Sequence, residues 1–141
     1  MRVMMIVKAS KLSETGAMPT VAHREAMGKY TEELQKAGVL LDFSGLQPTS
    51  AGARIKFSGG KRTVVDGPFT EAKELIAGYW VIQVKSKEEA IEWAKRIPAE
   101  ACEIEGVELR PFYELEDLAP GPAVAANELG KKLPANARGK P

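Results

Sequence analysis

Short apolar or alternating runs bounded by turn residues predict β-strands in this chain. Such runs occupy residues 3–7, 39–43, 53–57, 62–65, 78–84 and 106–115. The run at 78–84 is the clearest. Successive side chains of a strand point to opposite faces, so Trp80 and Ile82 share one face while Tyr79 and Val81 share the other. Both faces of this strand are therefore apolar.

Between the first two runs, the polar segment 8–18 predicts a loop, and the segment after it predicts a helix. Thr20 can cap its start, and Gly38 is suited to the position just after its end. Met27, Tyr30 and Leu34 recur at helical spacing and define its buried stripe, which continues to Ala37.

A second helix is predicted between the last two runs. Ser86 opens it with Glu89 three residues later, the pattern of a capping box, and Pro98 ends it. The runs at 53–57 and 62–65 flank Gly59 and Gly60, which favour a tight turn, and they predict a β-hairpin.

The elements follow the order strand, helix, strand, hairpin, strand, helix, strand. This order predicts an α+β fold, a ferredoxin-like βαββαβ sandwich with an added β-hairpin. The segment 44–52 either interrupts the second strand or separates it from the hairpin, and both interpretations stay open. In this fold the helices cover one face of the sheet, and the other face is polar in a monomer. Because Met4 and Ile6 alternate with Val3, Met5 and Val7, the central strands are apolar on both faces, and we expect a homodimer packed sheet against sheet.

Length and charge set further bounds. The 141 residues suit a single domain, and Lys+Arg 20 against Asp+Glu 19 gives a net charge of +1, which predicts no attraction to nucleic acid or to an anionic membrane. The N-terminal apolar run is too short for a signal peptide, and no run approaches a membrane span. Cys102 has no partner for a disulfide. We therefore expect a cytoplasmic protein with a folded domain at 1–116 and a Pro/Ala/Lys-rich extension at 117–141.

The segment "VVDGPFTEAKELIAGYWVIQV", followed by "EEAIEWAKRIP" and "VELRPF", resembles the YCII-related family and specifically its DGPF-type branch. The likeness also includes "GVLLDFSGLQP" and covers about residues 1–115. The resemblance implies a ferredoxin-like fold that dimerises as an α/β barrel. It implies no established activity for this branch.

Other branches of the wider family are thought to use a His–Asp dyad, and one relative removes chloride from a hydroxylated aromatic. The resemblance places the two dyad positions at about Met27 and Ile97, neither of which can transfer a proton. The dyad is therefore absent, although His23 lies one turn before Met27 on the same helix face.

Asp66 and His23 are the candidate catalytic residues. Asp66 either stabilises its turn by accepting backbone hydrogen bonds, or binds a cation or acts as a base. His23, the only histidine, is either a half-buried structural group or a group that titrates near neutral pH in a pocket.

The candidates for binding a small-molecule ligand are Asp66, Phe69, Lys73, Tyr30 and Arg110. Phe69 either anchors the turn in the core or offers a stacking surface. Lys73 either belongs to a solvated charged cluster or shapes a polar pocket. Arg110 either pairs with Glu108 or Glu74, or binds an anionic ligand.

Several site classes find no support in the sequence. One histidine and one cysteine give no ligand spacing for zinc, and no glycine-rich loop opens a helix as a phosphate site does. We therefore expect no metal and no cofactor. RNA-recognition domains display paired aromatic residues on their sheet, whereas Tyr79 stands alone on the face predicted to be open.

Two functions from different classes remain. The first is a dimeric small-molecule-binding or regulatory protein without turnover. The second is a cofactor-independent enzyme of the lyase or isomerase type that acts on a small organic substrate, for example an aromatic one. A cleft shared by His23 and Asp66 would favour the enzyme, because these residues are its only proton-transfer pair.

Overall fold

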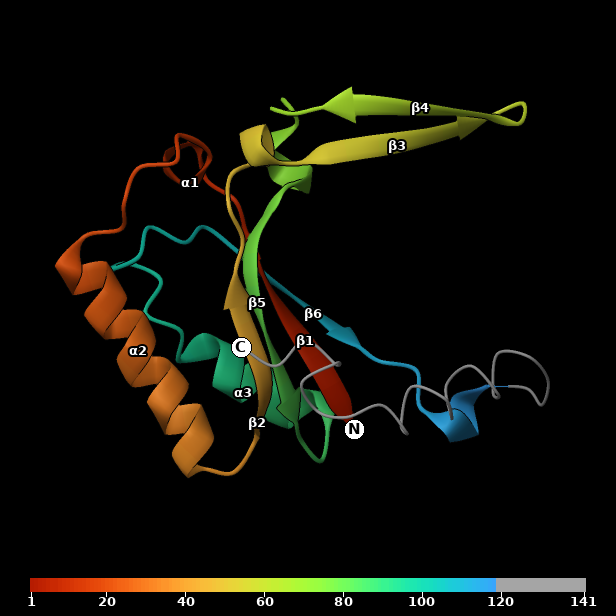
Figure 1. Cartoon of the computed structure of the whole chain (residues 1–141). Coiled ribbons are helices and arrows are strands. Elements are labelled where there is room, and N and C mark those ends of the chain that lie inside the picture. Colours follow the sequence, from red (N-terminus) through yellow and green to blue (C-terminus); the bar gives the residue numbers. More distant parts are fainter. Residues whose placement is uncertain (119–141) are drawn as a thin grey trace.

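The computed structural model describes residues 1–118, and its centre is a four-stranded antiparallel sheet with the strand order β2-β5-β1-β6 (Figure 1). The strands are β1 (Arg2–Lys8), β2 (Leu40–Gly45), β5 (Ile76–Gln83) and β6 (Val107–Pro111). Strands β5 and β1 are central and pair with each other, with β2 at one edge and β6 at the other. The predicted mixed α+β fold is confirmed.

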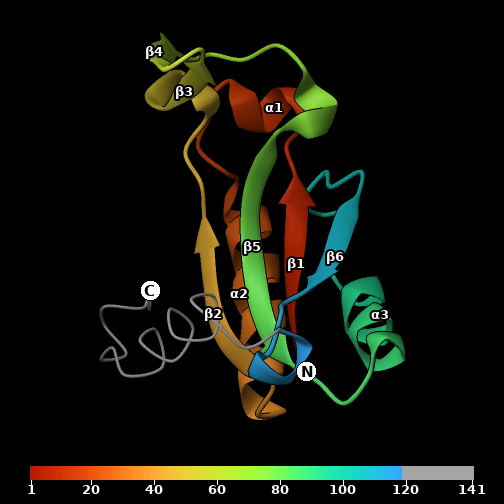
Figure 2. The same ribbon diagram turned by 90° about the vertical axis from the view of Figure 1, so that its right-hand side faces the viewer.

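Helices α2 (Val21–Lys36) and α3 (Lys87–Lys95) cover one face of this sheet, and Figure 2 looks onto the opposite face. Both predicted N-caps are present: Thr20 accepts a hydrogen bond from the backbone of His23, and Ser86 accepts one from the backbone of Glu89. These bonds satisfy N–H groups that have no partner within the helix.

The core lies between the sheet and these two helices. The register sets Val3 opposite Ile82 and Met5 opposite Trp80, and all four side chains are buried together with Leu34 of α2. The buried stripe predicted for this helix is confirmed at Leu34 and Tyr30, whereas Ala37 is the exposed residue that ends the helix. On the other face of the sheet, Met4 lies opposite Val81 and Ile6 opposite Tyr79.

The first strand is not covered on both faces in the single chain. Met4 and Ile6 are half-buried, while Val3, Met5 and Val7 are buried. An apolar surface therefore lies on the face that carries no helix.

The hairpin consists of β3 (Ala53–Ser58) and β4 (Lys61–Asp66), which form a separate two-stranded sheet. It projects from one end of the main sheet toward the side without helices (Figure 1). Gly59 and Gly60 make its turn with φ angles of 53° and 79°, which a glycine adopts without strain.

The sequence leaves open whether segment 44–52 interrupts the second strand or separates it from the hairpin. Strand β2 continues to Gly45, and residues 46–52, which contain the short helix η1 (Thr49–Ala51), separate it from the hairpin. The connections differ from the predictions in two places. The loop predicted for residues 8–18 holds a helix, α1 (Lys11–Glu14), and the last strand ends at Pro111 before η3 (Leu115–Asp117). Most of the predicted extension at 117–141 falls outside the described residues. Among residues 1–118, no helix is long and apolar enough to cross a membrane.

Candidate functional site

A groove of about 710 Å³ lies where the main sheet meets the hairpin. Its walls come from the end of β2 and the segment after it, from the base of β3, from Phe69, and from the start of β5. The lining residues are Gly45, Leu46, Gln47, Pro48, Thr49, Ala51, Gly52, Ala53, Arg54, Phe69, Glu74, Leu75 and Ile76. Leu46 and Ile76 each keep more than a third of their surface exposed although they are large and apolar.

The Asp66–Phe69 turn is fixed against the segment that forms one wall of this groove. The backbone N–H of Gly67 donates to the carbonyl of Gly52 over 3.0 Å, and the N–H of Phe69 donates to Thr49 Oγ1 over 3.0 Å. The Gly67–Pro68 peptide bond is cis. A Cβ atom on Gly67 would lie 1.7 Å from the carbonyl oxygen of Thr49, so only glycine fits this close approach.

Thr49 is itself fixed by α1. Its hydroxyl donates to Glu14 Oε2 over 2.6 Å, and its backbone N–H donates to Glu14 Oε1 over 3.1 Å. One carboxylate thus accepts two hydrogen bonds, and bonds to an ionised acceptor are among the stronger ones in proteins. Glu14, Thr49 and Phe69 form a chain of contacts between segments that are distant in sequence.

Arg54 places a positive charge above Phe69. Its guanidinium lies 3.8 Å from the centre of the ring, and a guanidinium within about 6 Å of an aromatic ring is attracted to its face. The same group lies 4.0 Å from the carboxylate of Glu71. Phe69 is half-buried and is not among the residues of the hydrophobic core, and its ring supports the arginine.

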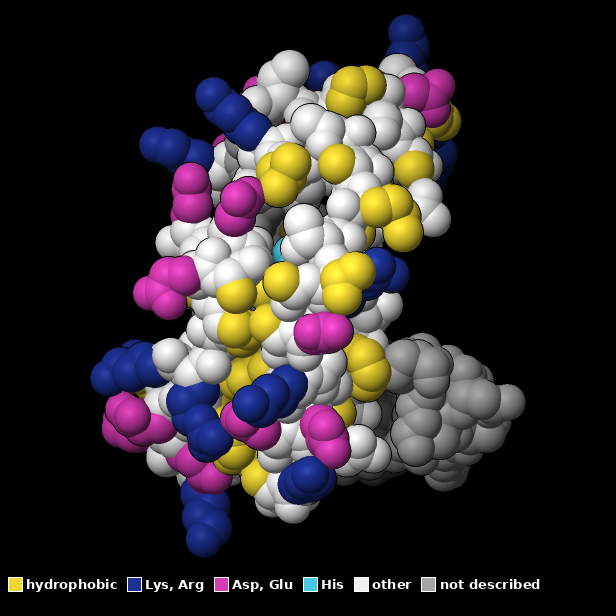
Figure 3. Space-filling view, turned by 90° about the vertical axis from the view of Figure 1, so that its left-hand side faces the viewer, with side chains coloured by type: hydrophobic (Ala, Val, Ile, Leu, Met, Phe, Trp, Pro, Cys, Tyr) yellow, Lys and Arg dark blue, Asp and Glu magenta, His cyan; other side chains and the backbone are white. Residues whose placement is uncertain are grey.

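The structure does not bring the two catalytic candidates together. Asp66 is exposed at the end of β4, opposite Ala53 in the hairpin register. His23 is half-buried in the first turn of α2, and only a small part of it reaches the surface (Figure 3). Within residues 1–118, no hydrogen bond joins their side chains, and neither residue lines the groove.

Tyr30 belongs to the core. Its hydroxyl donates to the backbone carbonyl of Trp93 over 2.6 Å, and its ring meets that of Trp80 edge to face at 5.1 Å. Burial raises the pKa of the Tyr30 hydroxyl far above its ordinary value. Tyr30 is therefore a structural residue of the core and does not line the groove.

The two remaining candidates lie at the surface. Arg110 pairs with Glu108 over 3.3 Å, one of the two partners predicted for it, and Lys8 binds the same carboxylate. Hydrogen bonds from Arg110 and Lys8 lower the pKa of the Glu108 carboxyl. Lys73 lies exposed in η2 (Ala72–Glu74), and its neighbour Glu74, not Lys73, lines the groove.

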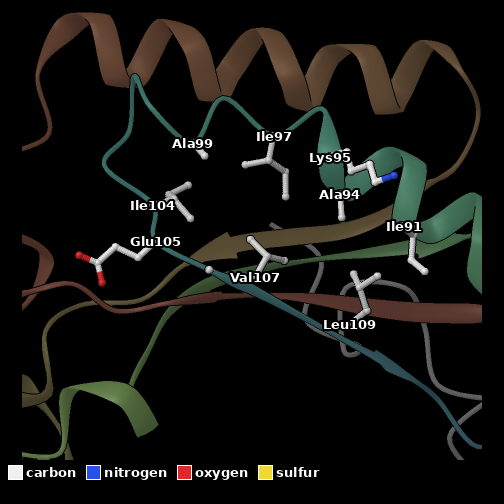
Figure 4. Close-up of a pocket in the computed structure, with 10 residues that line it drawn as sticks. Ile91, Ala94, Lys95, Ile97, Ala99, Ile104, Glu105, Val107 and Leu109 are labelled. Atoms are coloured by element: carbon white, nitrogen blue, oxygen red, sulfur yellow. The ribbon is translucent and has the colours of Figure 1, made fainter.

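A second, smaller groove of about 370 Å³ lies between α3 and β6 (Figure 4). Ile97, Ile104, Val107 and Leu109 give it an apolar lining, and Glu105 points away from them. Ile97 is one of the two positions where relatives are thought to carry the dyad, and it is buried against the core, as Met27 partly is. The two ionisable residues among its lining are Lys95 and Glu105. The described residues also contain no cluster of three side chains that could hold a metal ion.

Arg54, Glu14 and Thr49 are the site residues that the sequence interpretation missed. Glu14 falls in a segment predicted as loop, and Thr49 lies 35 residues from it along the chain. The DGPF segment itself was the one usable signal, because its Gly and Phe make the contacts that define the groove wall.

The comparison with protein families supports the resemblance to the YCII-related family. The family model of the YCII-related domain matches residues 1–113. The chain belongs to the YCII-related domain family. Its similarity to an uncharacterized protein, R00369, of Rhizobium meliloti (strain 1021) is 36% identity over 84 residues, which is 60% of this chain and 64% of the relative. The match therefore spans less than two thirds of that relative's length.

A solved structure similar to this YCII-related chain is 5-chloro-2-hydroxyhydroquinone dehydrochlorinase from Burkholderia phenoliruptrix AC1100, in complex with 2,5-dihydroxybenzoquinone. The two chains share 11% sequence identity with a TM-score of 0.48, over 80% of this chain and 94% of the other.

Proposed function

We propose that this YCII-related chain is a dimeric small-molecule-binding protein of the DGPF-type branch, and that it binds a small organic anion in the groove at the hairpin base. The single observation that carries this proposal is Arg54, whose guanidinium lies on the Phe69 ring at the groove wall. A guanidinium presents a fork of donors that matches a carboxylate. The exposed side chains of Leu46 and Ile76 supply apolar surface for the body of such a ligand.

The groove wall has the fixed geometry that binding requires. Glu14 holds Thr49, Thr49 holds the backbone of Phe69, and Phe69 supports Arg54. A site whose groups are already held in place loses less conformational entropy when the ligand binds.

The geometry favours binding over turnover. The alternative function, a cofactor-independent lyase or isomerase, needs a proton donor or acceptor within reach of the substrate. In the described part of the chain, neither His23 nor Asp66 lines the groove. Glu74, which is exposed, does line it, but no histidine, lysine or second carboxylate stands among the described lining residues as a proton-transfer partner.

The homodimer is supported by the sheet face that carries no helix. The strand order, β2-β5-β1-β6 with antiparallel pairing, is that of a ferredoxin-like sandwich. Met4, Ile6 and Tyr79, which are only half-buried, lie beside the buried Val81 on the uncovered face by register. A second copy packed on this face would remove their apolar surface from water.

The test is calorimetric titration of the full chain with a panel of small carboxylates, namely benzoate, 2-hydroxybenzoate, phenylacetate and hexanoate. We expect at least one to bind, and the Arg54→Gln variant to bind it roughly tenfold more weakly because the charge-assisted hydrogen bonds are lost. Arg110→Gln is the matched control, since Arg110 is an exposed arginine outside the groove, paired with Glu108. Binding that is lost in Arg110→Gln and kept in Arg54→Gln would contradict the assigned site. Absence of binding across the panel would contradict the ligand class.

A further inference from the structure

The hairpin formed by β3 and β4, here called the hairpin arm (residues 53–66), is exposed along its whole length. Its register sets Ile55 opposite Val64 and Phe57 opposite Arg62, so Ile55, Val64 and Phe57 share one face. The exposed fractions of these three side chains are 52%, 65% and 68%. A two-stranded hairpin alone is at best marginally stable in water, and an exposed apolar patch commonly marks an interaction surface.

A second exposed segment follows β6. It is the acidic turn, defined as residues 113–117 with the sequence Tyr113, Glu114, Leu115, Glu116 and Asp117. Tyr113 has 74% of its surface exposed. In Figures 1 and 2 the hairpin arm and η3 of the acidic turn lie toward opposite ends of the sheet, and both project on the side without helices. The apolar sheet face lies between them.

Charge distinguishes the two segments. The hairpin arm carries Arg54, Lys56, Lys61 and Arg62 against the single acid Asp66, whereas the acidic turn has three acids and no base. Several of these groups have partners within the chain: Arg54 lies near Glu71, and Glu114 pairs with Arg2. Among the ion pairs of residues 1–118, none involves Lys56, Lys61, Arg62 or Glu116.

A twofold axis that packs two copies on their open sheet faces lies in the plane between the sheets, and its direction relative to the strands has two limiting cases. An axis parallel to the strands brings both hairpin arms to the same end, where their basic side chains repel. An axis perpendicular to the strands, in the plane between the sheets, brings each arm to the end where its partner carries the acidic turn. Complementary charge selects orientation at an interface, and a twofold interface makes each such contact twice.

We propose that the hairpin arm of one copy packs on the acidic turn of a second copy of this chain, so that two arms clasp the dimer. The clasp rests on the homodimer proposed above and adds its orientation and its contacts. The Ile55, Phe57 and Val64 face supplies apolar contact for Tyr113 and Leu115. Arg62, which lies opposite Phe57 on this same face, meets Glu116 and Asp117, and Lys61 adjoins it at the tip of the arm.

The first test measures dimer dissociation by sedimentation velocity across a concentration series of the full chain. We expect the Lys61→Glu/Arg62→Glu variant to dissociate at a concentration at least about tenfold higher than the wild type, because acid then meets acid. Glu116→Lys/Asp117→Lys should do the same. The four-substitution chain should recover most of the wild-type affinity, since the charges are again opposite. Lys87→Glu on α3 is the matched control and should leave dissociation unchanged.

The second test uses cross-linking in a Cys102→Ser background. A mixture of the Lys61→Cys chain and the Glu116→Cys chain should form a disulfide-linked dimer under mild oxidation, and each chain alone should form far less. Efficient linkage of Lys61→Cys to itself would show the arms at the same end and overturn the clasp. A dissociation concentration that is unchanged in both charge-reversal variants would also overturn the clasp while leaving the homodimer and the groove intact. A wild type that stays monomeric at every concentration would overturn the homodimer as well.

Discussion

The strands of the core and the strands of the hairpin arm have similar sequences. The core strands are buried beneath the helices, whereas the arm is exposed to solvent. In β1 the side chain of Met5 is 0% exposed, and in β4 that of Val64 is 65% exposed. Both strands alternate or cluster apolar residues, and both pair with an antiparallel neighbour. The difference is that β1 has a layer of helices to pack against, while the arm has none within the single chain.

This contrast separates what forms a strand from what stabilises it. Backbone hydrogen bonds and turn glycines are enough to define the arm, but they bring little net free energy because water offers the unfolded chain comparable bonds. Burial of a large apolar side chain contributes about 1.5–3 kcal/mol. The core receives this contribution at Met5, Leu34 and Ile82, whereas the arm would receive it only from a partner.

The largest expected effect on stability comes from shortening a side chain of the core. Leu34→Ala should lower the free energy of unfolding by about 2–5 kcal/mol, because Leu34 is 0% exposed and its removal leaves a cavity between α2 and the sheet. Val64→Ala on the arm should lower it by less than about 0.5 kcal/mol at concentrations where the chain is monomeric. Urea unfolding monitored by tryptophan fluorescence measures both. Equal losses in the two variants at low concentration would show that the arm is as tightly packed as the core.

The next effect concerns the contact that joins the arm to the rest of the molecule. Gly67→Ala should cost about 1–3 kcal/mol, since the new methyl group would meet the carbonyl of Thr49 and force the turn and η1 apart. Carboxylate binding in the groove should weaken in the same variant, because the Thr49 hydroxyl holds the backbone of Phe69.

Gly28→Ala is the matched control for this substitution. Gly28 lies inside α2, and a Cβ there would have no neighbour within 4 Å. The variant should therefore gain about 0.4–1 kcal/mol from the reduced freedom of the unfolded chain and keep its ligand affinity. A Gly67→Ala protein as stable as the wild type would contradict the close approach seen in the structure.

The same contrast explains how far the sequence could be interpreted. Periodicity and capping residues predicted the sheet strands, both long helices and the hairpin, because these signals are local. The groove depends instead on contacts between distant segments, such as Thr49 with Glu14 and Arg54 with Phe69. No pattern along the chain indicates that these pairs meet. The position of Tyr30, by contrast, follows from a local pattern. Its helical spacing with Leu34 indicates a place in the core, and Tyr30 is buried there.

The smallest expected effect is electrostatic and concerns the acidic turn at the other end of the sheet. Arg2 Nε donates to Glu114 Oε1 over 3.0 Å, and this hydrogen bond lowers the pKa of the Glu114 carboxyl below its ordinary value. A carboxyl whose pKa is lower in the folded state contributes stability above its unfolded pKa. That contribution disappears as the pH falls through the folded pKa.

Glu114→Gln should therefore be slightly less stable than the wild type at neutral pH, by about 0–1 kcal/mol because the pair is partly exposed and screened by water. The difference should shrink as the pH is lowered below about 4 and vanish once the wild-type carboxyl is protonated. Thermal unfolding of both proteins between about pH 3 and pH 7 measures it, with Glu32→Gln on α2 as a control, since Glu32 forms an exposed pair with Lys36 in the helix. A difference that stays constant over this range would mean that Glu114 contributes through packing of its side chain rather than through its charge.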